Sequence, residues 1–186
     1  MENIEIFIYS IIQGITEFLP VSSSAHLYFI QDIYNWQDNA LVLAIGAHLG
    51  TFLAVMVFNR KLFINFKETH LFPFALAASL PVILIGGVIG LLEYDSFKSN
   101  LYIIAFACIA GGILLELSDK KKKNKNKIIF RDSVIVGVFQ IFALIPGMSR
   151  SGTVITAMRF LGINRKLSIT FSLLTGIPVL LAVCVF

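Results

Sequence analysis

Charged residues are scarce in this sequence of 186 residues: they make up 14% of it, whereas hydrophobic residues make up 57% and the mean hydropathy is +0.85. A water-soluble domain of this length needs a polar surface, and a surface as apolar as this one would aggregate in water. The composition therefore excludes an ordinary soluble domain. It favours a membrane protein, in which each spanning helix needs about 20 mostly apolar residues.

Cysteine is also rare. The sequence contains only Cys108 and Cys184, both in apolar runs, where thiols usually pack as small hydrophobic side chains. A disulfide scaffold or a cysteine-ligated metal site is therefore not expected. The first five residues contain no lysine or arginine, so we expect no cleavable signal peptide and expect the N-terminal apolar stretch to remain in the mature protein.

Uninterrupted apolar runs predict spanning helices at residues 40–58, 72–92, 101–117 and 167–186. Two other apolar stretches, 4–31 and 134–161, are interrupted by proline and by polar side chains. Neither makes one good span, so each is predicted to be a hairpin of two half-helices. The hairpins share a weak pattern of a glutamine, a proline and a serine: Gln13, Pro20 and Ser23 in the first, and Gln140, Pro146 and Ser149 in the second.

The basic loops predict the orientation of the chain, because positively charged loops lie mostly on the cytoplasmic side. Two predicted spans separate the basic segment 60–67 from the lysine-rich run 120–127, so both fall on the cytoplasmic side and the acidic segment 93–96 lies outside. The basic group at 159–166 also reaches the cytoplasm when 134–161 enters the membrane and returns. One predicted span separates the first hairpin from the basic segment 60–67, so the first hairpin enters the membrane from outside.

The predicted fold is an all-α, polytopic membrane protein with two re-entrant helical hairpins in an inverted repeat, an arrangement known from transporters. The single membrane domain, 1–186, divides into a first repeat at 1–118, a basic cytoplasmic loop at 119–131 and a partial second repeat at 132–186. The second repeat is about two spans shorter than the first. We therefore expect either a C-terminally truncated member of a larger design or a minimal form of that design.

Gln13 and Glu17 lie four residues apart, so they share a face of a helix. A carboxylate inside a membrane is costly and marks a functional site by default; the alternative is a buried glutamate paired with a basic residue. Oxygen ligands of this kind suit Mg²⁺ or Ca²⁺, whose other ligands come from water and substrate phosphates. The two residues are therefore predicted to bind a divalent cation.

Pro20 and the serines that follow it are typical of a helix start, whose free N–H groups and positive dipole end attract phosphate. Ser22 and Ser23 can share a helix face with His26. A serine near a histidine can become a nucleophile with the histidine as its base, or the imidazole itself can attack phosphorus. The alternative is a set of hydrogen bonds between helices.

The segment 146–152 is rich in donors. Arg150 can form a bidentate hydrogen bond to phosphate, Ser149 and Ser151 add hydroxyl groups, and Gly147 allows the backbone to approach a ligand closely. The alternative is an arginine that extends to the membrane surface. That reading would place the arginine on the side opposite to the basic loops, so we expect a phosphate-binding segment.

The remaining polar residues have simpler interpretations. His48, within a predicted span, has either a packing role or a secondary role in the site. The lysine run is a solvated loop with some attraction for anionic lipid, and no nucleic-acid partner is expected. Where the two hairpins meet, Glu17, His26 and Arg150 form with the serines one site that can hold a diphosphate. Because that site lies at membrane depth, we expect the tail of the substrate to be a lipid.

These segments resemble the signatures of the undecaprenyl-diphosphate phosphatase family, the bacterial membrane enzymes linked to bacitracin resistance. The first signature corresponds to 13–26 (QGITEFLPVSSSAH) and the second to 146–152 (PGMSRSG), and 47–54 (AHLGTFLA) is similar to a further family segment. The likeness extends over essentially the whole sequence.

The resemblance implies hydrolysis of undecaprenyl diphosphate to the monophosphate and phosphate, which recycles the carrier lipid of cell-wall synthesis, by a multi-pass protein of the bacterial inner membrane. It implies a divalent metal, Mg²⁺ or Ca²⁺, at Glu17 and Gln13 and phosphate binding by Arg150. Family mechanisms use either a serine, here Ser23, or the histidine, here His26, as nucleophile; we expect attack by Ser23 assisted by His26. The implied partners are an isoprenoid lipid diphosphate and membrane lipid, with a homodimer as one assembly that the sequence allows.

Two other functions fit the same features. Inverted broken helices with charges near the midplane are typical of secondary transporters, so a carrier or lipid flippase for an isoprenoid phosphate is the first alternative. An inactive fragment that only occupies the membrane is the second. Release of phosphate distinguishes a phosphatase, which hydrolyses the diphosphate, from a carrier, which does not.

Overall fold

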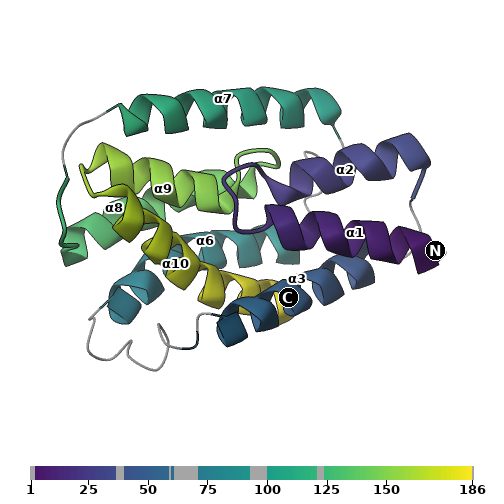
Figure 1. Ribbon diagram of the computed structural model, residues 1–186, viewed down its shortest axis with the longest axis horizontal. Coiled ribbons are helices and arrows are strands. Elements are labelled where there is room, and N and C mark those ends of the chain that lie inside the picture. The colour runs from purple at the N-terminus through teal and green to yellow at the C-terminus, as the bar shows by residue number, and fades with distance from the viewer. Residues whose placement is uncertain are drawn as a thin grey trace.

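The computed structural model of this protein describes residues 3–36, 40–58, 60, 71–92, 100–120 and 124–185. All regular elements in these ranges are helical (Figure 1): α1 (Asn3–Thr16), α2 (Ser23–Tyr34), α3 (Ala40–Phe58), α6 (Leu71–Leu91), α7 (Leu101–Asp119), α8 (Phe130–Gln140), the 3-10 helix η1 (Ile141–Leu144), α9 (Arg150–Phe160) and α10 (Arg165–Val185). The predicted all-α class is confirmed for the described residues. The predicted spans correspond to α3, α6, α7 and α10, with ends that differ by a residue or two at most.

Among the described residues, three helices are long and apolar enough to cross a membrane: α6, α7 and residues Arg165–Cys184 of α10. Helix α3 is also apolar, over the shorter stretch Val42–Phe58. Large side chains on the outside of these helices are strongly exposed, for example Phe58 at 92%, Tyr102 at 88% and Leu91 at 77%. Water does not stabilise such a surface, whereas lipid does. The chain is therefore a membrane protein.

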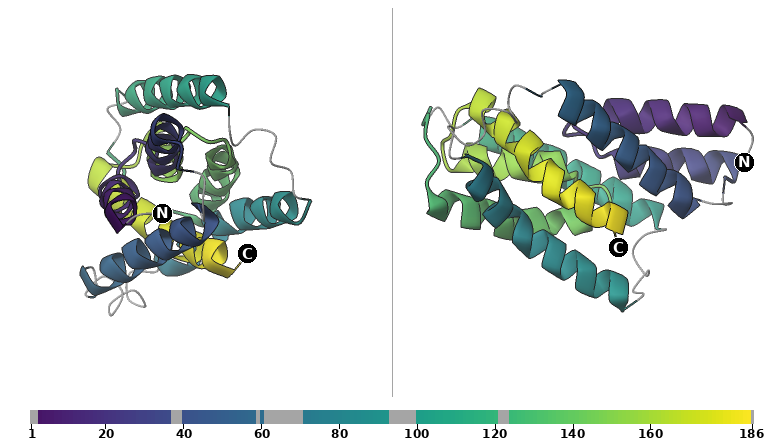
Figure 2. Two further views of the ribbon diagram at one scale, coloured as in Figure 1. Left: turned by 90° about the vertical axis from the view of Figure 1, so that its right-hand side faces the viewer. Right: turned by 90° about the horizontal axis from the view of Figure 1, so that it is seen from below.

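The two polar-interrupted stretches each form a pair of short helices that turn in the middle of the molecule (Figure 1). Helices α1 and α2 form one pair, and α8 with η1 and α9 forms the other. The pairs approach from opposite ends, so that α2 and α9 lie nearly end to end with their N-terminal ends in the centre (Figures 1 and 2). The turns also touch, because the Ser151 hydroxyl donates a hydrogen bond to the Leu19 carbonyl at 2.7 Å.

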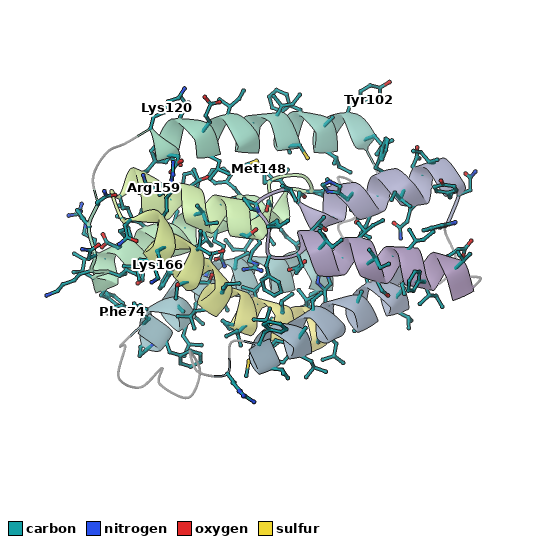
Figure 3. The ribbon with its side chains drawn as sticks, viewed as in Figure 1. Phe74, Tyr102, Lys120, Met148, Arg159 and Lys166 are labelled. Atoms are coloured by element: carbon teal, nitrogen blue, oxygen red, sulfur yellow. The ribbon has the colours of Figure 1, made fainter. Side chains whose placement is uncertain are left out.

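Basic residues gather at one end of the molecule. Lys120, Arg159 and Lys166 lie at the same end, whereas Tyr102 lies at the other end of α7 (Figure 3). The lysine-rich run and the 159–166 group were predicted to lie on one side, and these three residues of the two groups do lie at one end (Figure 3). The predicted basic loop after Arg60 and the acidic segment 93–96 lie outside the described residues.

The core lies where α6, α8, α9 and α10 pack together, and it includes the fully buried Val136, Met158 and Phe171. Gly137 of α8 allows the close approach of α6, because a Cβ atom at this position would lie 2.9 Å from the Ala78 carbonyl oxygen. Small residues permit such backbone contacts between membrane helices. This core fixes the second helix pair against α10.

The connection between α7 and α8 is shorter than the predicted loop, because α7 ends at Asp119 and α8 begins at Phe130. Part of it is also ordered by the turn between α9 and α10. Lys125 donates its N–H to the Gly162 carbonyl at 2.8 Å, and its carbonyl accepts the Asn164 N–H at 3.0 Å. The basic segment is therefore paired with the chain that follows α9.

Asp119 of α7 connects this helix to α9 and α10 at the basic end of the molecule. Its carboxylate accepts a hydrogen bond from Arg159 Nε at 2.9 Å and from Arg165 Nε at 2.8 Å, with a second contact from Arg165 Nη2. The Arg159 side chain is 5% exposed, and it also donates to the Ile163 carbonyl at 2.6 Å. A buried guanidinium needs such partners because an unpaired buried charge is very costly.

We expect Asp119→Ala to lower the free energy of unfolding by roughly 3 kcal/mol, because it leaves the buried Arg159 without its carboxylate. The matched control is Glu116→Ala on the same helix. Glu116 pairs with Lys120, and both side chains are about two thirds exposed, at 69% and 67%, so its loss should change stability by about 1 kcal/mol or less. Thermal unfolding in mild detergent measures both variants. Equal melting temperatures for the two variants would contradict the role given to Asp119.

Candidate active site

The two central helix starts have the same local structure. Ser22 is the N-cap of α2 and accepts a hydrogen bond from the Ala25 N–H, and Ser149 is the N-cap of α9 and accepts one from the Gly152 N–H. Both serines have a positive φ, 61° for Ser22 and 57° for Ser149. Residues other than glycine adopt this conformation rarely, and such strain tends to occur at functional sites.

The structure changes which residues of the two hairpins are equivalent to each other. The sequence pattern paired Ser23 with Ser149, but the two N-caps pair Ser22 with Ser149. Ser22 then follows Gln13 at the same spacing at which Ser149 follows Gln140, and both glutamines are fully buried. In this register Ser23 and Arg150 are equivalent first residues of their helices. The sequence pattern matched Pro20 with Pro146. Pro20 stands two residues before Ser22, whereas Pro146 stands three residues before Ser149, so matching the prolines shifted the serines by one position.

Glu17 lies between these two helix starts and contacts both of them. Its Oε2 accepts hydrogen bonds from Ser23 Oγ at 2.8 Å and from Gln13 Nε2 at 2.8 Å. Its Oε1 lies 3.4 Å from Nη2 of Arg150, which comes from the second hairpin. The Glu17 side chain is only 7% exposed. One buried carboxylate therefore links the predicted metal ligand, the predicted nucleophile and the predicted phosphate-binding arginine.

Arg150 is held on three sides. Besides Glu17, its Nη1 donates to the Ser172 carbonyl of α10 at 2.8 Å. Its guanidinium also lies over the ring of Phe18, 5.6 Å from the ring centre, where a cation–π interaction is favourable. The side chain is 11% exposed. Three of its five N–H groups are not used by these two hydrogen bonds, so they can bind an anion.

A cavity of about 200 Å³ lies beside these groups. Apolar residues of α6, η1 and α10 line one part of it. The polar part is lined by His48 of α3 and by residues at or near the two helix starts: Glu17, Ser22, Ser23, Ser24, Ser149 and Arg150. Two helix N-termini and a guanidinium favour an anion in this space. The cavity can hold a diphosphate group, but it is too small for a long lipid tail as well.

Several predicted site residues lie around the cavity rather than in its wall. His26 is exposed, and its Nδ1 donates to the Ser22 carbonyl at 2.8 Å. Ser151 donates to the Leu19 carbonyl and so joins the two turns. Gly147 has φ of 103° and lies against α7, since a Cβ atom there would lie 2.5 Å from the Ile104 carbonyl oxygen. The need for glycine at 147 is therefore explained by this contact with α7.

The structure pairs Ser23 with Glu17, whereas the sequence suggested His26 as the partner of Ser23. On α2, Ser23 is the first helical residue, and its hydroxyl points back to the end of the first hairpin arm. The His26 ring is directed to the N-cap carbonyl of its own helix. Because that carbonyl can only accept, the ring proton lies on Nδ1 and the Nε2 lone pair stays available.

His48, for which the sequence left two interpretations open, belongs to the site. It lines the cavity, and its Nδ1 lies 2.8 Å from Gln13 Nε2 and 3.5 Å from Glu17 Oε2. Because an amide nitrogen can only donate, the His48 Nδ1 accepts and its ring proton lies on Nε2. Gln13 therefore holds both Glu17 and His48 through one NH₂ group.

The side-chain oxygens of Gln13 and Glu17 are candidate ligands of a divalent cation. The Gln13 Oε1 is buried and has no hydrogen-bond partner among the described residues, and the Nε2 of the same amide donates to the Glu17 carboxylate. Hard oxygen atoms of this kind suit Mg²⁺ or Ca²⁺ better than softer metals. No cluster of three or more histidine, cysteine, aspartate or glutamate residues occurs in the described part of the chain. The residues therefore fit an ion that takes most of its ligands from water and phosphate.

Fold and site together define a helical membrane protein with a buried polar site where two pairs of short helices meet. The model of the family described as "Bacitracin resistance protein BacA" matches residues 6–186. The chain belongs to this family.

Curated relatives support the same assignment. The chain is 40% identical over 185 residues to an undecaprenyl-diphosphatase of Pelagibacter ubique, with 94% of this chain and 70% of that protein covered. It is 36% identical over 202 residues to an undecaprenyl-diphosphatase of Hahella chejuensis, covering 100% of this chain and 76% of that protein. It is also 36% identical to an undecaprenyl-diphosphatase of Nitrosococcus oceani, covering 97% and 74%.

Proposed function

We propose that this protein hydrolyses undecaprenyl diphosphate to undecaprenyl phosphate and phosphate, and so recycles the carrier lipid of cell-wall synthesis. The observation that carries the proposal is the position of Glu17 between Ser23 and Arg150, at 2.8 and 3.4 Å, beside a cavity of diphosphate size. The family and the names of its curated members agree with it. The lipid tail lies outside the polar cavity, against the apolar surface of the helices.

In the proposed mechanism the diphosphate enters the cavity between the N-terminal ends of α2 and α9. Arg150 and the free N–H groups of the two helix starts hold its negative charge. Ser23 Oγ then attacks the terminal phosphorus. A bond forms between Oγ and that phosphorus, the bond from phosphorus to the bridging oxygen breaks, and undecaprenyl phosphate leaves. The hydroxyl proton passes to Glu17 Oε2, which already accepts the Ser23 hydrogen bond.

The second step returns the enzyme to its starting state. Water attacks the phosphorus of the phosphoserine, the bond from phosphorus to Ser23 Oγ breaks, and phosphate is released while Ser23 Oγ takes back the proton that Glu17 Oε2 accepted in the first step. We assign the uptake of the water proton to His26, because its Nδ1 hydrogen bond to the Ser22 carbonyl leaves the Nε2 lone pair free. His26 is exposed, so it then releases this proton to solvent. Ser22 lines the cavity, so this imidazole lies next to the cavity wall.

We propose that Gln13 Oε1 and Glu17 hold a divalent cation, Mg²⁺ or Ca²⁺. When bound, such an ion neutralises part of the charge of a diphosphate and helps to orient it. The support is the buried, unpartnered oxygen of Gln13 beside the Glu17 carboxylate. The remaining ligands would be water and phosphate oxygens.

We also propose that the chain is a multi-pass protein of the bacterial inner membrane and that both helix pairs are re-entrant, in an inverted repeat. The entry of the pairs from opposite ends supports this topology (Figure 1), as does the matched geometry of Ser22 and Ser149. Polar backbone at membrane depth is tolerated where it lines a cavity, and broken helices that meet near the midplane are known from membrane proteins of this type.

A bacterial strain whose own undecaprenyl-diphosphate phosphatases can be depleted tests the function in cells. We expect the wild-type chain to sustain growth after depletion and to raise tolerance to bacitracin. Arg150→Ala, present in the membrane at an equal level, should do neither, because the phosphate-binding charge is lost. A carrier without hydrolytic activity would not restore growth. Failure of the wild-type chain at a normal membrane level would therefore contradict the proposal.

A further inference from the structure

Arg150 reaches the cavity only because α10 leaves room for its guanidinium. The residue of α10 that faces the guanidinium is Gly176, which lies one helical turn after Ser172. A Cβ atom at position 176 would lie 2.7 Å from Nη1, 3.0 Å from Cζ and 3.0 Å from Nη2 of Arg150. These are its three nearest neighbours, and all belong to one functional group.

This environment differs from that of Gly137 in α8 and of Gly147 in the turn before α9. Gly137 would place a Cβ atom against the backbone of α6, and Gly147 would place one against the backbone of α7. In both cases the glycine serves helix packing. At Gly176 the neighbour is the end of a flexible side chain, which can move away without disturbing the helices. The two interactions that such a movement would break are those of Arg150 with Ser172 and Glu17.

We propose that Gly176 is a positioning residue of the phosphatase: the missing side chain creates the space on α10 in which Arg150 is oriented toward the diphosphate. This inference rests on the proposed function, because the ligand of Arg150 is the diphosphate of the substrate. The Ser172 carbonyl accepts a hydrogen bond from Nη1, the guanidinium lies against Gly176, and Nη2 contacts Glu17. A side chain at position 176 displaces the Arg150 guanidinium from this orientation, while the fold is retained.

The test uses Gly176→Ala and inorganic diphosphate, whose binding to the purified full chain is measured as a dissociation constant and as inhibition of phosphate release. We expect affinity to fall at least about 10-fold, an effect typical of a displaced charge-assisted hydrogen bond. The melting temperature should be unchanged. Gly90→Ala on α6 is the matched control, because a Cβ atom at Gly90 meets nothing within 4 Å, and it should bind diphosphate like the wild type.

A double-mutant cycle with Arg150→Ala makes the test specific. Adding Gly176→Ala to Arg150→Ala should cause no further loss of affinity, because the group that it displaces is gone. Equal losses in both backgrounds, or unchanged affinity of a folded Gly176→Ala chain, would overturn the inference. Unfolding of the Gly176→Ala chain would also overturn it, because the inference requires that the guanidinium moves while the fold is retained. Failure of the proposed function is distinct, since the wild-type chain would then release no phosphate.

Discussion

Ser23→Ala is expected to abolish turnover, with kcat lower by roughly 10⁴-fold or more, the size of loss seen when a catalytic nucleophile is removed. The reason lies in the contact of Ser23 Oγ with Glu17 Oε2 at 2.8 Å, which places a base next to the hydroxyl at the start of α2. Alanine keeps the helix start, because the capping hydroxyl belongs to Ser22. The fold should therefore persist while phosphate release is lost.

His26→Ala is the comparison that identifies the nucleophile. We expect a loss of roughly 10²- to 10⁴-fold in steady-state turnover, as for a general base, while an enzyme-bound phosphate still forms. After rapid quenching, the wild type and His26→Ala should carry an acid-stable phosphoserine, and Ser23→Ala should carry none. An acid-labile phosphoenzyme that forms in Ser23→Ala and disappears in His26→Ala would instead identify the imidazole as the attacking group.

Glu17→Gln is expected to lower kcat/KM by at least about 10³-fold, since it removes the negative charge that accepts the Ser23 proton and pairs with Arg150. Glutamine has nearly the same shape, so the loss should come from charge rather than from packing. Its NH₂ group would also compete with the NH₂ group of Gln13, which now donates to Glu17 Oε2 at 2.8 Å. The measurement is phosphate release at matched amounts of folded protein.

The exchange variant Gln13→Glu with Glu17→Gln gives this test a matched control. It conserves the net charge and the residue types of the pair, but it moves the carboxylate to the position that faces His48. We expect it to remain inactive, because the new carboxylate contacts neither Ser23 nor Arg150. Recovery of near wild-type activity would show that the site needs a negative charge without needing it at position 17.

The sequence predicted the elements of this site well because their signals are local. Apolar runs marked the long helices, and Pro20 and Pro146 marked the two turns. The i and i+4 spacing placed Gln13 and Glu17 on one face of α1, where they are joined at 2.8 Å. The basic loops predicted that the two helix pairs point in opposite directions, and in the structure the pairs do approach from opposite ends (Figure 1).

The parts that could not be predicted depend on contacts between distant segments. Arg150 and Glu17 are 133 positions apart, and Ser172 and Gly176 come from a helix whose sequence looks like an ordinary apolar span. Nothing local indicates that a glycine in α10 faces a guanidinium. For the same reason the sequence could not show that Gly147 lies against α7, because this contact follows only from how the turn before α9 packs.

The role of His48 shows the same limit. Its ring is placed by Gln13, which lies 35 positions earlier in the chain, so spacing gave no reason to choose between packing and function. The sequence also suggested His26 as the partner of Ser23, because the two residues can share a helix face, whereas the structure places Glu17 Oε2 at 2.8 Å from Ser23 Oγ. Only the direction of the turn between α1 and α2 selects Glu17.

The most direct test of this account is phosphate release from undecaprenyl diphosphate by the purified chain in mild detergent, with Mg²⁺ or Ca²⁺ and with a chelator. We expect release that depends on the divalent cation in the wild type and in Gly90→Ala, and none in Arg150→Ala, with similar melting temperatures for all three. Phosphate release that survives in a folded Arg150→Ala chain would contradict the assigned site. No release from a folded wild-type chain would contradict the proposed activity itself.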